Sequence, residues 1–156
     1  MHKQSGVTMI EIILAIAILA IVSSLSASLY HKWQKQVQLI NAQDEMISAL
    51  IRTQQLATAA AKGDDWGLHL ESNYYVMFPG NTYDENNPDN KMWNLNGVQI
   101  MNPTSTFADG LGGYSSNVIF TKFNGQTANT GTISINTIAD QNIIKTITVE
   151  SSGQIN

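Results

Sequence analysis

The sequence contains no cysteine among its 156 residues. Without cysteine no disulfide can form, so the folded part of the chain must be stabilised by packing alone. Charged residues are also scarce, at 13% of the chain, and the net charge is −4. The length fits one folded domain with an added segment better than two domains.

Glycine and proline are both absent from residues 7–62. These two residues are the strongest helix breakers, so the sequence predicts one long helix over this range, with Gly63 as its stop. The first part of this range is apolar on every side. Further along, apolar residues recur at helical spacing, at Leu25, Leu29, Trp33, Val37, Ile40, Ile47, Leu50 and Ile51. We therefore expect the second half of the helix to be amphipathic and to pack on a core.

The familiar catalytic motifs are missing as well. The sequence has no Gly-x-Ser-x-Gly, no His-Glu-x-x-His and no glycine-rich phosphate loop. Beyond the first six residues the histidines are His31 and His69, and we interpret His69 as an ordinary strand residue. The sequence therefore predicts that the chain is not an enzyme and uses no cofactor.

Positive charge is scarce beyond the predicted helix. After residue 62 the basic residues are Lys91, Lys122 and Lys145, against nine acidic residues. Nucleic-acid binding requires a basic patch that neutralises phosphates, so this balance disfavours DNA as a partner.

A loop at residues 81–90 concentrates oxygen-bearing side chains. Asp84, Glu85 and Asp89 lie there beside asparagines, and oxygen ligands suit Ca²⁺. The spacing is not that of an EF-hand, and acidic loops of this kind are usually solvated turns. We keep the three residues as candidate calcium ligands and favour no metal site.

The rest of the chain has strand patterns. We predict a hairpin of residues 66–70 and 74–78, a strand at 92–101 with Gly97 as a possible bulge, and a strand at 117–123. A last hairpin is expected from 131–138 and 143–149. The fold class is therefore α+β, with the back half of a long N-terminal helix packed on an antiparallel β-sheet head.

One carboxylate interrupts the apolar run near its start. Glu11 has no basic residue beside it in residues 6–22. An ionised acid at membrane depth costs about 2.5–3.5 kcal/mol, so it needs a compensating partner. Cleavage between Gly6 and Val7 would create an α-amine four residues before Glu11. In a stack of identical helices, that amine could meet the carboxylate of the next subunit.

Residues 5–11 resemble the N-terminal signature of type IV pilins and pseudopilins. Gly6 matches the residue before the cut, Thr8 matches, two apolar residues follow, and Glu11 matches the acid. Val7 stands where the family usually has phenylalanine. The resemblance implies cleavage after Gly6 by prepilin peptidase, N-methylation at Val7, and roles for Thr8 and Glu11 in assembly.

The order of the later elements resembles the minor pseudopilins of type II secretion and related minor type IV pilins. Gln154 departs from that pattern, because an arginine commonly follows the last glycine there. The resemblance implies three regions: a leader at 1–6, a transmembrane and filament-core helix at 7–30, and a pilin-like head at 31–156 that includes the amphipathic half of the helix.

We expect a structural subunit of a type IV pilus or a type II secretion pseudopilus. Its partners would be other pilin subunits, prepilin peptidase, the inner-membrane assembly platform and, before assembly, membrane lipid. It would cross the bacterial inner membrane once and then enter a periplasmic or extracellular filament. The alternatives are a minor pilin at the filament tip that binds DNA or a surface ligand, and, for the N-terminus alone, an ordinary secretory signal or plain anchor.

Overall fold

The computed structural model describes residues 6–156, without the side chains of residues 24–29 and 31. The predicted leader lies outside the described residues except for Gly6. The chain divides after Gln36 into two compact units, and each is described by itself. We call residues 6–23 the N-terminal segment and residues 37–156 the head unit.

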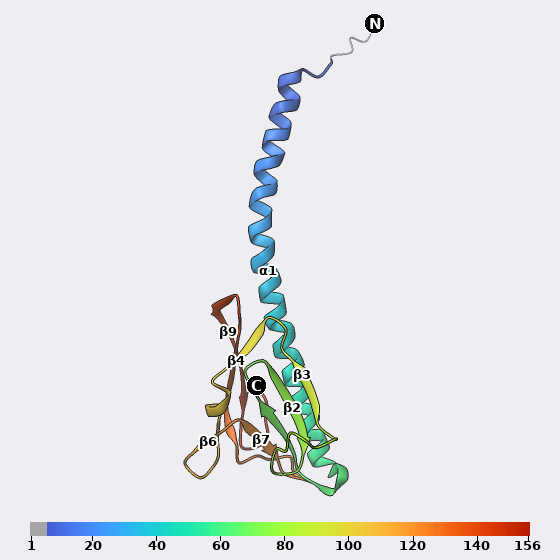
Figure 1. The fold of residues 1–156 in the computed structure, drawn as a ribbon, viewed down its shortest axis with the longest axis vertical. Helices are drawn as coiled ribbons and strands as arrows, with labels where there is room; N and C mark the ends of the chain where they lie inside the picture. Colours follow the sequence, from blue (N-terminus) through green and yellow to red (C-terminus); the bar gives the residue numbers. More distant parts are fainter. Residues whose placement is uncertain (1–5) are drawn as a thin grey trace. The chain divides into compact units, whose positions relative to one another are not determined.

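A single long helix dominates the first part of the chain. Helix α1 covers Met9–Thr58 (Figure 1). The expected stop at Gly63 is wrong: α1 already ends at Thr58. The backbone of Ala60 is left-handed, with φ of 46°, and turns the chain out of the helix. A short 3₁₀ turn, η1 (Ala61–Gly63), follows.

Carbonyl groups just before and after this end have partners outside α1. Carbonyl groups in the last turn of a helix have no partner within the helix itself. The Ala57 carbonyl accepts from the backbone N–H of Phe123 (3.2 Å), and the Ala61 carbonyl accepts from the Trp66 indole N–H (2.9 Å). These contacts satisfy carbonyls that a continuing helix would have used.

The amphipathic half of α1 buries a different stripe from the predicted one. The buried helix residues are Leu39, Met46, Ala49, Leu50, Thr53 and Ala57. They repeat at three, four or seven residues and so lie on one face. Ile40 and Ile51 were expected on this face, but they are 37% and 41% exposed. Trp33, in the first unit, was expected in a core or in an interfacial belt; at 62% exposed it is not in a core, and the belt stays a prediction.

The first sheet of the head unit has four antiparallel strands in the order β3-β2-β1-β7. They are β1 (Trp66–Leu70), β2 (Tyr74–Pro79), β3 (Lys91–Asn94) and β7 (Asn117–Phe120). The predicted hairpin is confirmed, with Leu68 opposite Met77. The strand expected at 117–123 ends at Phe120.

The second sheet has five strands in the order β4-β8-β5-β6, with β9 along the other side of β8. They are β4 (Val98–Met101), β5 (Phe107–Ala108), β6 (Tyr114–Ser115), β8 (Thr130–Thr137) and β9 (Asp140–Val149). The turn η2 (Pro103–Ser105) precedes β5. The last hairpin is confirmed, with a tighter connection than expected and a register shift between Asn136 and Thr137.

The strand expected at 92–101 is in fact two strands in different sheets. Gly97 is not a bulge within one strand; its φ of 74° turns the chain between β3 and β4. Such a backbone conformation is readily accessible to glycine. The expected single β-sheet is therefore two sheets, and this residue lies where the chain crosses from one to the other.

One core joins the helix to both sheets. Its members include Leu50 of α1, Leu68 and Phe120 of the first sheet, and Phe107 and Ile133 of the second, each 0% exposed. Burial alternates along β4 and β7, as in a half-buried strand, whereas β1 and β2 in the middle of the first sheet carry consecutive buried residues. The fold class is confirmed as α+β, a long N-terminal helix packed on antiparallel sheets.

Candidate functional site

The predicted assembly residues lie at the start of α1. Gly6, Val7 and Thr8 precede the helix, and Met9 is its first residue. The Thr8 carbonyl accepts from the backbone N–H groups of Glu11 (3.1 Å) and Ile12 (3.3 Å), so Thr8 occupies the N-cap position.

Thr8 and Glu11 have the spacing of a capping box. In that motif a threonine at the N-cap and a glutamate three residues later satisfy each other's exposed N–H groups. Glu11 also lies in the first turn, where the helix dipole favours negative charge. Glu11 therefore occupies a position that favours an acid for local reasons, besides its predicted role in assembly.

Gly6 is not required by its local packing. A side chain built on Gly6 would meet nothing within 4 Å. Its backbone is also not left-handed, unlike seven other glycines of the chain. The fold therefore gives no reason for glycine at this position.

Every described side chain of the N-terminal segment is exposed. Its large apolar residues range from Ile12, 50% exposed, to Met9, 80% exposed. Apolar residues cover all sides of this helix, and such a surface marks contact with lipid or protein. Among the described residues, the structure holds no helix with the length and apolarity that crossing a bilayer requires.

The candidate calcium loop is held together by its own hydrogen bonds. The Asp84 carboxylate accepts from the backbone N–H of Asn86 (3.0 Å), and the Asn90 amide donates to the Asp84 carbonyl (2.8 Å). Asp89 forms an ion pair with Lys62. Among the described residues, no three histidine, aspartate or glutamate side chains converge as metal ligands.

His69 is a bridging residue of the first sheet. Its Nδ1 lies 2.6 Å from the Asn117 side-chain oxygen, and its Nε2 lies 3.2 Å from the Glu71 carboxylate. The Tyr83 ring stacks on the imidazole at 4.0 Å. Because both ring nitrogens face an amide and a carboxylate, the imidazole is not paired with a hydroxyl nucleophile.

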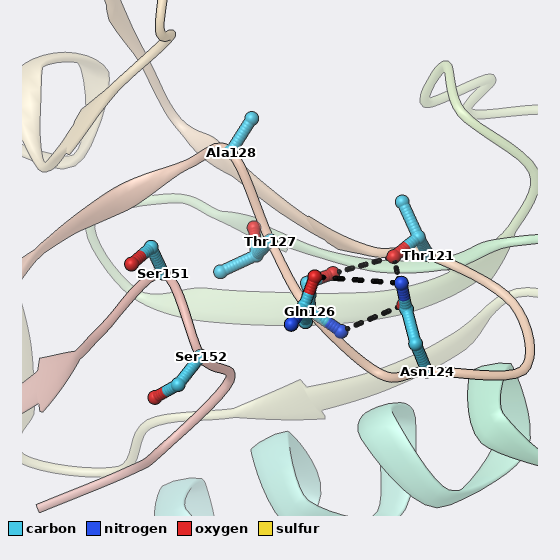
Figure 2. A pocket seen from close by; sticks show the side chains of 7 residues that line it. All are labelled: Thr121, Asn124, Gln126, Thr127, Ala128, Ser151 and Ser152. Carbon is cyan, nitrogen blue, oxygen red and sulfur yellow. Dashed lines mark hydrogen bonds between the residues drawn. The ribbon is translucent and has the colours of Figure 1, made fainter.

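A polar pocket of about 520 Å³ lies between two loops of the head unit. Figure 2 shows Thr121, Asn124 and Gln126 joined by hydrogen bonds on one side, with Ser151 and Ser152 on the neighbouring loop. Every lining side chain is neutral, so the pocket offers no cation for a phosphate. Its amides and hydroxyls are largely engaged with one another.

One amide of α1 fixes both loops that form this polar pocket. The Gln54 side-chain nitrogen donates to the Gly125 carbonyl (3.0 Å) and to the Gly153 carbonyl (2.9 Å). The Thr127 N–H donates to the Ser151 carbonyl (3.2 Å) and joins the loops a second time. The polar pocket is therefore a consequence of two loops clamped by one helix residue.

A second pocket, of about 310 Å³, lies where the end of α1 meets the first sheet. We call it the Trp66 pocket. Its apolar wall comes from Leu56, Ala61, Trp66 and Met77. Its charged lining residues are Arg52, Lys62, Asp89 and Lys91. This pocket could not be predicted from the sequence, because its residues come from the helix, a turn, three strands and a loop.

A third feature is the connection between β5 and β6, residues 109–113, which we call the Leu111 loop. Tyr114, the first residue of β6, follows it directly. Leu111 is 93% exposed, and Tyr114 is 72% exposed. Two large apolar residues so close together on a surface indicate an interaction site.

The comparisons with known proteins fall on both parts of the chain. The chain matches no curated protein. Residues 1–27 match the family described as the prokaryotic N-terminal methylation motif. The fold is similar to that of the minor pseudopilin EpsH from the type 2 secretion system of Vibrio cholerae, with a TM-score of 0.54 at 15% sequence identity. That match covers 76% of this chain and 94% of the pseudopilin chain.

The expected resemblance is confirmed in two independent ways. The motif match includes Gly6, Val7, Thr8 and Glu11, and the structural match establishes a pilin-like fold. Cleavage, methylation and assembly at these four residues stay predictions.

Proposed function

We propose that this chain, which carries a prepilin-type methylation motif on a pilin-like fold, is a processed structural subunit of a pilus or secretion pseudopilus. The observation that carries the proposal is the N-terminal segment. It exposes apolar side chains on every face and has one acid, Glu11, at its start. A surface of this kind is covered by lipid before assembly and by neighbouring subunits afterwards.

Processing creates the N-terminus that assembly uses. Prepilin peptidase cuts between Gly6 and Val7, and Val7 becomes the methylated N-terminal residue. The open space around Gly6 and the absence of helix at residues 6–8 support this proposal, since a protease needs an accessible, non-helical segment.

Glu11 then recruits the subunit and sets its register. Its charge is expensive in an apolar surrounding unless an opposite charge lies beside it. The α-amine of Val7 in the neighbouring subunit supplies that charge. This pairing acts in addition to the capping role of Glu11, and the two roles respond differently to substitution.

Residues 7–30 hold the precursor in the bacterial inner membrane with a single pass. They later leave the lipid and pack against the same residues of neighbouring subunits in a periplasmic or extracellular filament. Extraction requires an assembly platform and an ATPase elsewhere, because the chain has no nucleotide-binding motif. The partners are thus other pilin subunits, prepilin peptidase and the assembly platform.

The charge of the head unit favours this structural role over DNA capture at a filament tip. The head unit has five basic residues against eleven acidic ones. Such an excess of acid repels phosphates over most of the surface. Gln154, where an arginine is common in similar chains, donates instead to the Asn156 side chain (3.0 Å).

Mass spectrometry of the N-terminus tests the proposal. Mature protein extracted from native cells is expected to begin at methylated Val7. A Gly6→Leu variant should accumulate as full-length precursor, whereas Ser5→Ala, a neighbouring change that keeps the glycine, should be processed normally. Filament protein that still begins at Met1 would overturn the proposed processing and the pairing that depends on it.

A further inference from the structure

The charges of the Trp66 pocket do not match those of the rest of the head unit. Arg52, Lys62 and Lys91 are three of the five basic residues there, and all three line this one pocket. Asp89 pairs with Lys62. Arg52 and Lys91 form no ion pair among the described residues. Two uncompensated cations therefore lie beside an apolar wall.

This lining defines the chemistry of the group that the pocket would accept. Leu56, Ala61, Trp66 and Met77 favour an apolar side chain, and the cations favour an acid next to it. The Trp66 ring is held in place, because its N–H donates to the Ala61 carbonyl (2.9 Å). The pocket is preformed and needs an apolar group with a neighbouring carboxylate.

The Leu111 loop carries these two groups two residues apart. The Asp109 carboxylate accepts from the backbone N–H groups of Leu111 and Gly113, each at 2.8 Å. These hydrogen bonds hold the pKa of Asp109 below its usual range, so the carboxylate is charged at neutral pH. Gly110 and Gly112 have φ of 76° and 96°, which lets the loop wrap around the carboxylate.

The loop is therefore ordered before any partner arrives. Leu111 is 93% exposed, so its own chain does not cover it. A preorganised loop loses less conformational entropy on binding than a flexible one. It presents a leucine and a fixed negative charge, which fit the apolar wall of the Trp66 pocket and the two cations there that form no ion pair among the described residues.

We propose that the Leu111 loop of one copy of this chain inserts into the Trp66 pocket of the next copy. Loop and pocket belong to different elements: in Figure 1, β6 lies at the left of the head unit and the C-terminal end of α1 at its right. Contact between two different surfaces is heterologous, and when the rotation does not close it generates a helical filament. This inference rests on the proposed role as a filament subunit and adds a lateral contact between heads.

The contact is small and works only in addition to helix packing. One loop in one pocket buries less than the roughly 1,200 Å² of a stable interface. Held together by their N-terminal segments, however, neighbouring heads meet at high effective concentration. The loop then fixes the rotation of one head against the next.

Cysteine cross-linking tests this contact on a background without native cysteine. The full-length double variant Leu111→Cys with Ala61→Cys is expressed in the native host as the only copy of the protein. Oxidation, and in parallel a short bis-maleimide reagent with longer reach, should give a ladder of dimers and higher multimers of this chain. Each single variant alone should give no ladder.

A charge substitution separates the pocket from a random encounter. In the double-cysteine background, Arg52→Glu should reduce the ladder about tenfold, the effect of about 1.4 kcal/mol. Lys145→Glu makes the same change in charge at a basic residue outside the pocket, and it should leave the ladder unchanged. Equal effects of the two substitutions would overturn the proposal.

The remaining outcomes are equally decisive. Dimers from Leu111→Cys alone would indicate a symmetric contact, and cross-links to a different protein would identify another occupant; either result overturns the proposal. If the double variant enters filaments with a processed N-terminus and gives no ladder with either reagent, this inference fails and the proposed function stands. If the wild-type chain neither loses its leader nor enters filaments, the proposed function itself fails.

Discussion

The N-terminal segment and the head unit treat apolar side chains in opposite ways. In the head unit, Leu50, Phe78 and Phe107 are each 0% exposed. In the N-terminal segment, Leu14 is 62% exposed and Ile16 is 61% exposed. The head unit buries its apolar surface within itself, whereas the N-terminal segment needs another surface to cover its own.

Under the proposed function, this difference places stability and assembly in separate parts of one helix. An apolar residue that is buried within its own chain contributes mainly to the stability of the fold. An apolar residue that is exposed in the single chain contributes free energy only when a partner covers it. The same substitution at two positions of α1 should therefore give two different phenotypes.

Leucine-to-alanine substitution at two positions of α1 gives the largest expected effect. Leu50→Ala should lower the free energy of unfolding of the head unit by about 2–5 kcal/mol, because it leaves a cavity in the core. Leu14→Ala should leave that free energy unchanged and instead reduce the amount of protein in sheared filaments. Urea denaturation of detergent-solubilised full-length protein measures the first effect.

The pair also tests the comparison itself. If Leu14→Ala destabilised the head unit as much as Leu50→Ala does, the two regions could not have separate tasks. If neither substitution changed filament content, the apolar surface of the N-terminal segment would not be what subunits use to associate.

Glu11 offers a way to separate charge from helix capping. Glu11→Gln keeps a residue that can complete a capping box but removes the charge. We expect Glu11→Gln and Glu11→Ala to insert in the membrane equally well and to lose filament incorporation equally. Wild-type Glu11 costs about 2.5–3.5 kcal/mol while it is unpaired in an apolar surrounding, and pairing in the filament relieves this cost. The variants lack this driving force, so their incorporation should fall by about 100-fold.

Immunoblots of sheared filaments and membranes give the ratio needed for this test. Normal incorporation of Glu11→Gln beside failure of Glu11→Ala would show that capping with Thr8, rather than charge, is what assembly requires. Normal incorporation of both would remove Glu11 from assembly.

Periodicity and the absence of helix breakers were enough to predict the long helix, the first hairpin and the last hairpin. They failed where a distant part of the chain decides the outcome. The Ala57 carbonyl near the end of α1 accepts from the N–H of the distant Phe123, and the crossing between sheets depends on how Gly97 turns. Such partners leave no local signal.

The candidate sites differ in the same way: a local motif can be predicted from the sequence, and a pocket built from distant elements cannot. Gly6, Val7, Thr8 and Glu11 lie within one short motif and could be read directly from the sequence. Arg52 and Lys91, in contrast, are brought to the Trp66 pocket from elements that lie far apart in the sequence. Ile40 and Ile51 were expected on the buried face because they are apolar. The buried face is centred on the line of Leu39 and Met46, and both isoleucines lie at its exposed margin.

Gln54 should show how far the head unit depends on one polar contact. Gln54→Ala removes both hydrogen bonds that clamp the loops at Gly125 and Gly153. We expect the free energy of unfolding to fall by about 2 kcal/mol, at about 1 kcal/mol for each bond. Gln55→Ala, an exposed neighbour of the same type, should have little effect in the same urea titration. Equal results for the two variants would contradict the clamp.

The smallest expected effect is a gain, at Tyr75 in the core of the head unit. Its ring is 0% exposed and stacks on Trp93 at 5.6 Å. Its hydroxyl has no hydrogen-bond partner among the described residues. A buried hydroxyl without a partner is costly, so Tyr75→Phe should raise the free energy of unfolding by about 1 kcal/mol.

The pH dependence of this gain follows from the sign of the pKa shift. Burial, with a smaller contribution from Glu45, raises the pKa of Tyr75 above its usual value near 10. The folded state therefore keeps the proton, and above about pH 10 only the unfolded wild-type chain ionises at this residue. The free energy of unfolding of the wild-type chain therefore falls as the pH rises above this value. The Tyr75→Phe variant has no hydroxyl to ionise at this position, so it does not show this decrease. The advantage of Tyr75→Phe in thermal unfolding should thus widen between pH 9 and 11. An advantage that shrinks instead would show that the folded state stabilises the ionised phenolate, which would contradict the raised pKa.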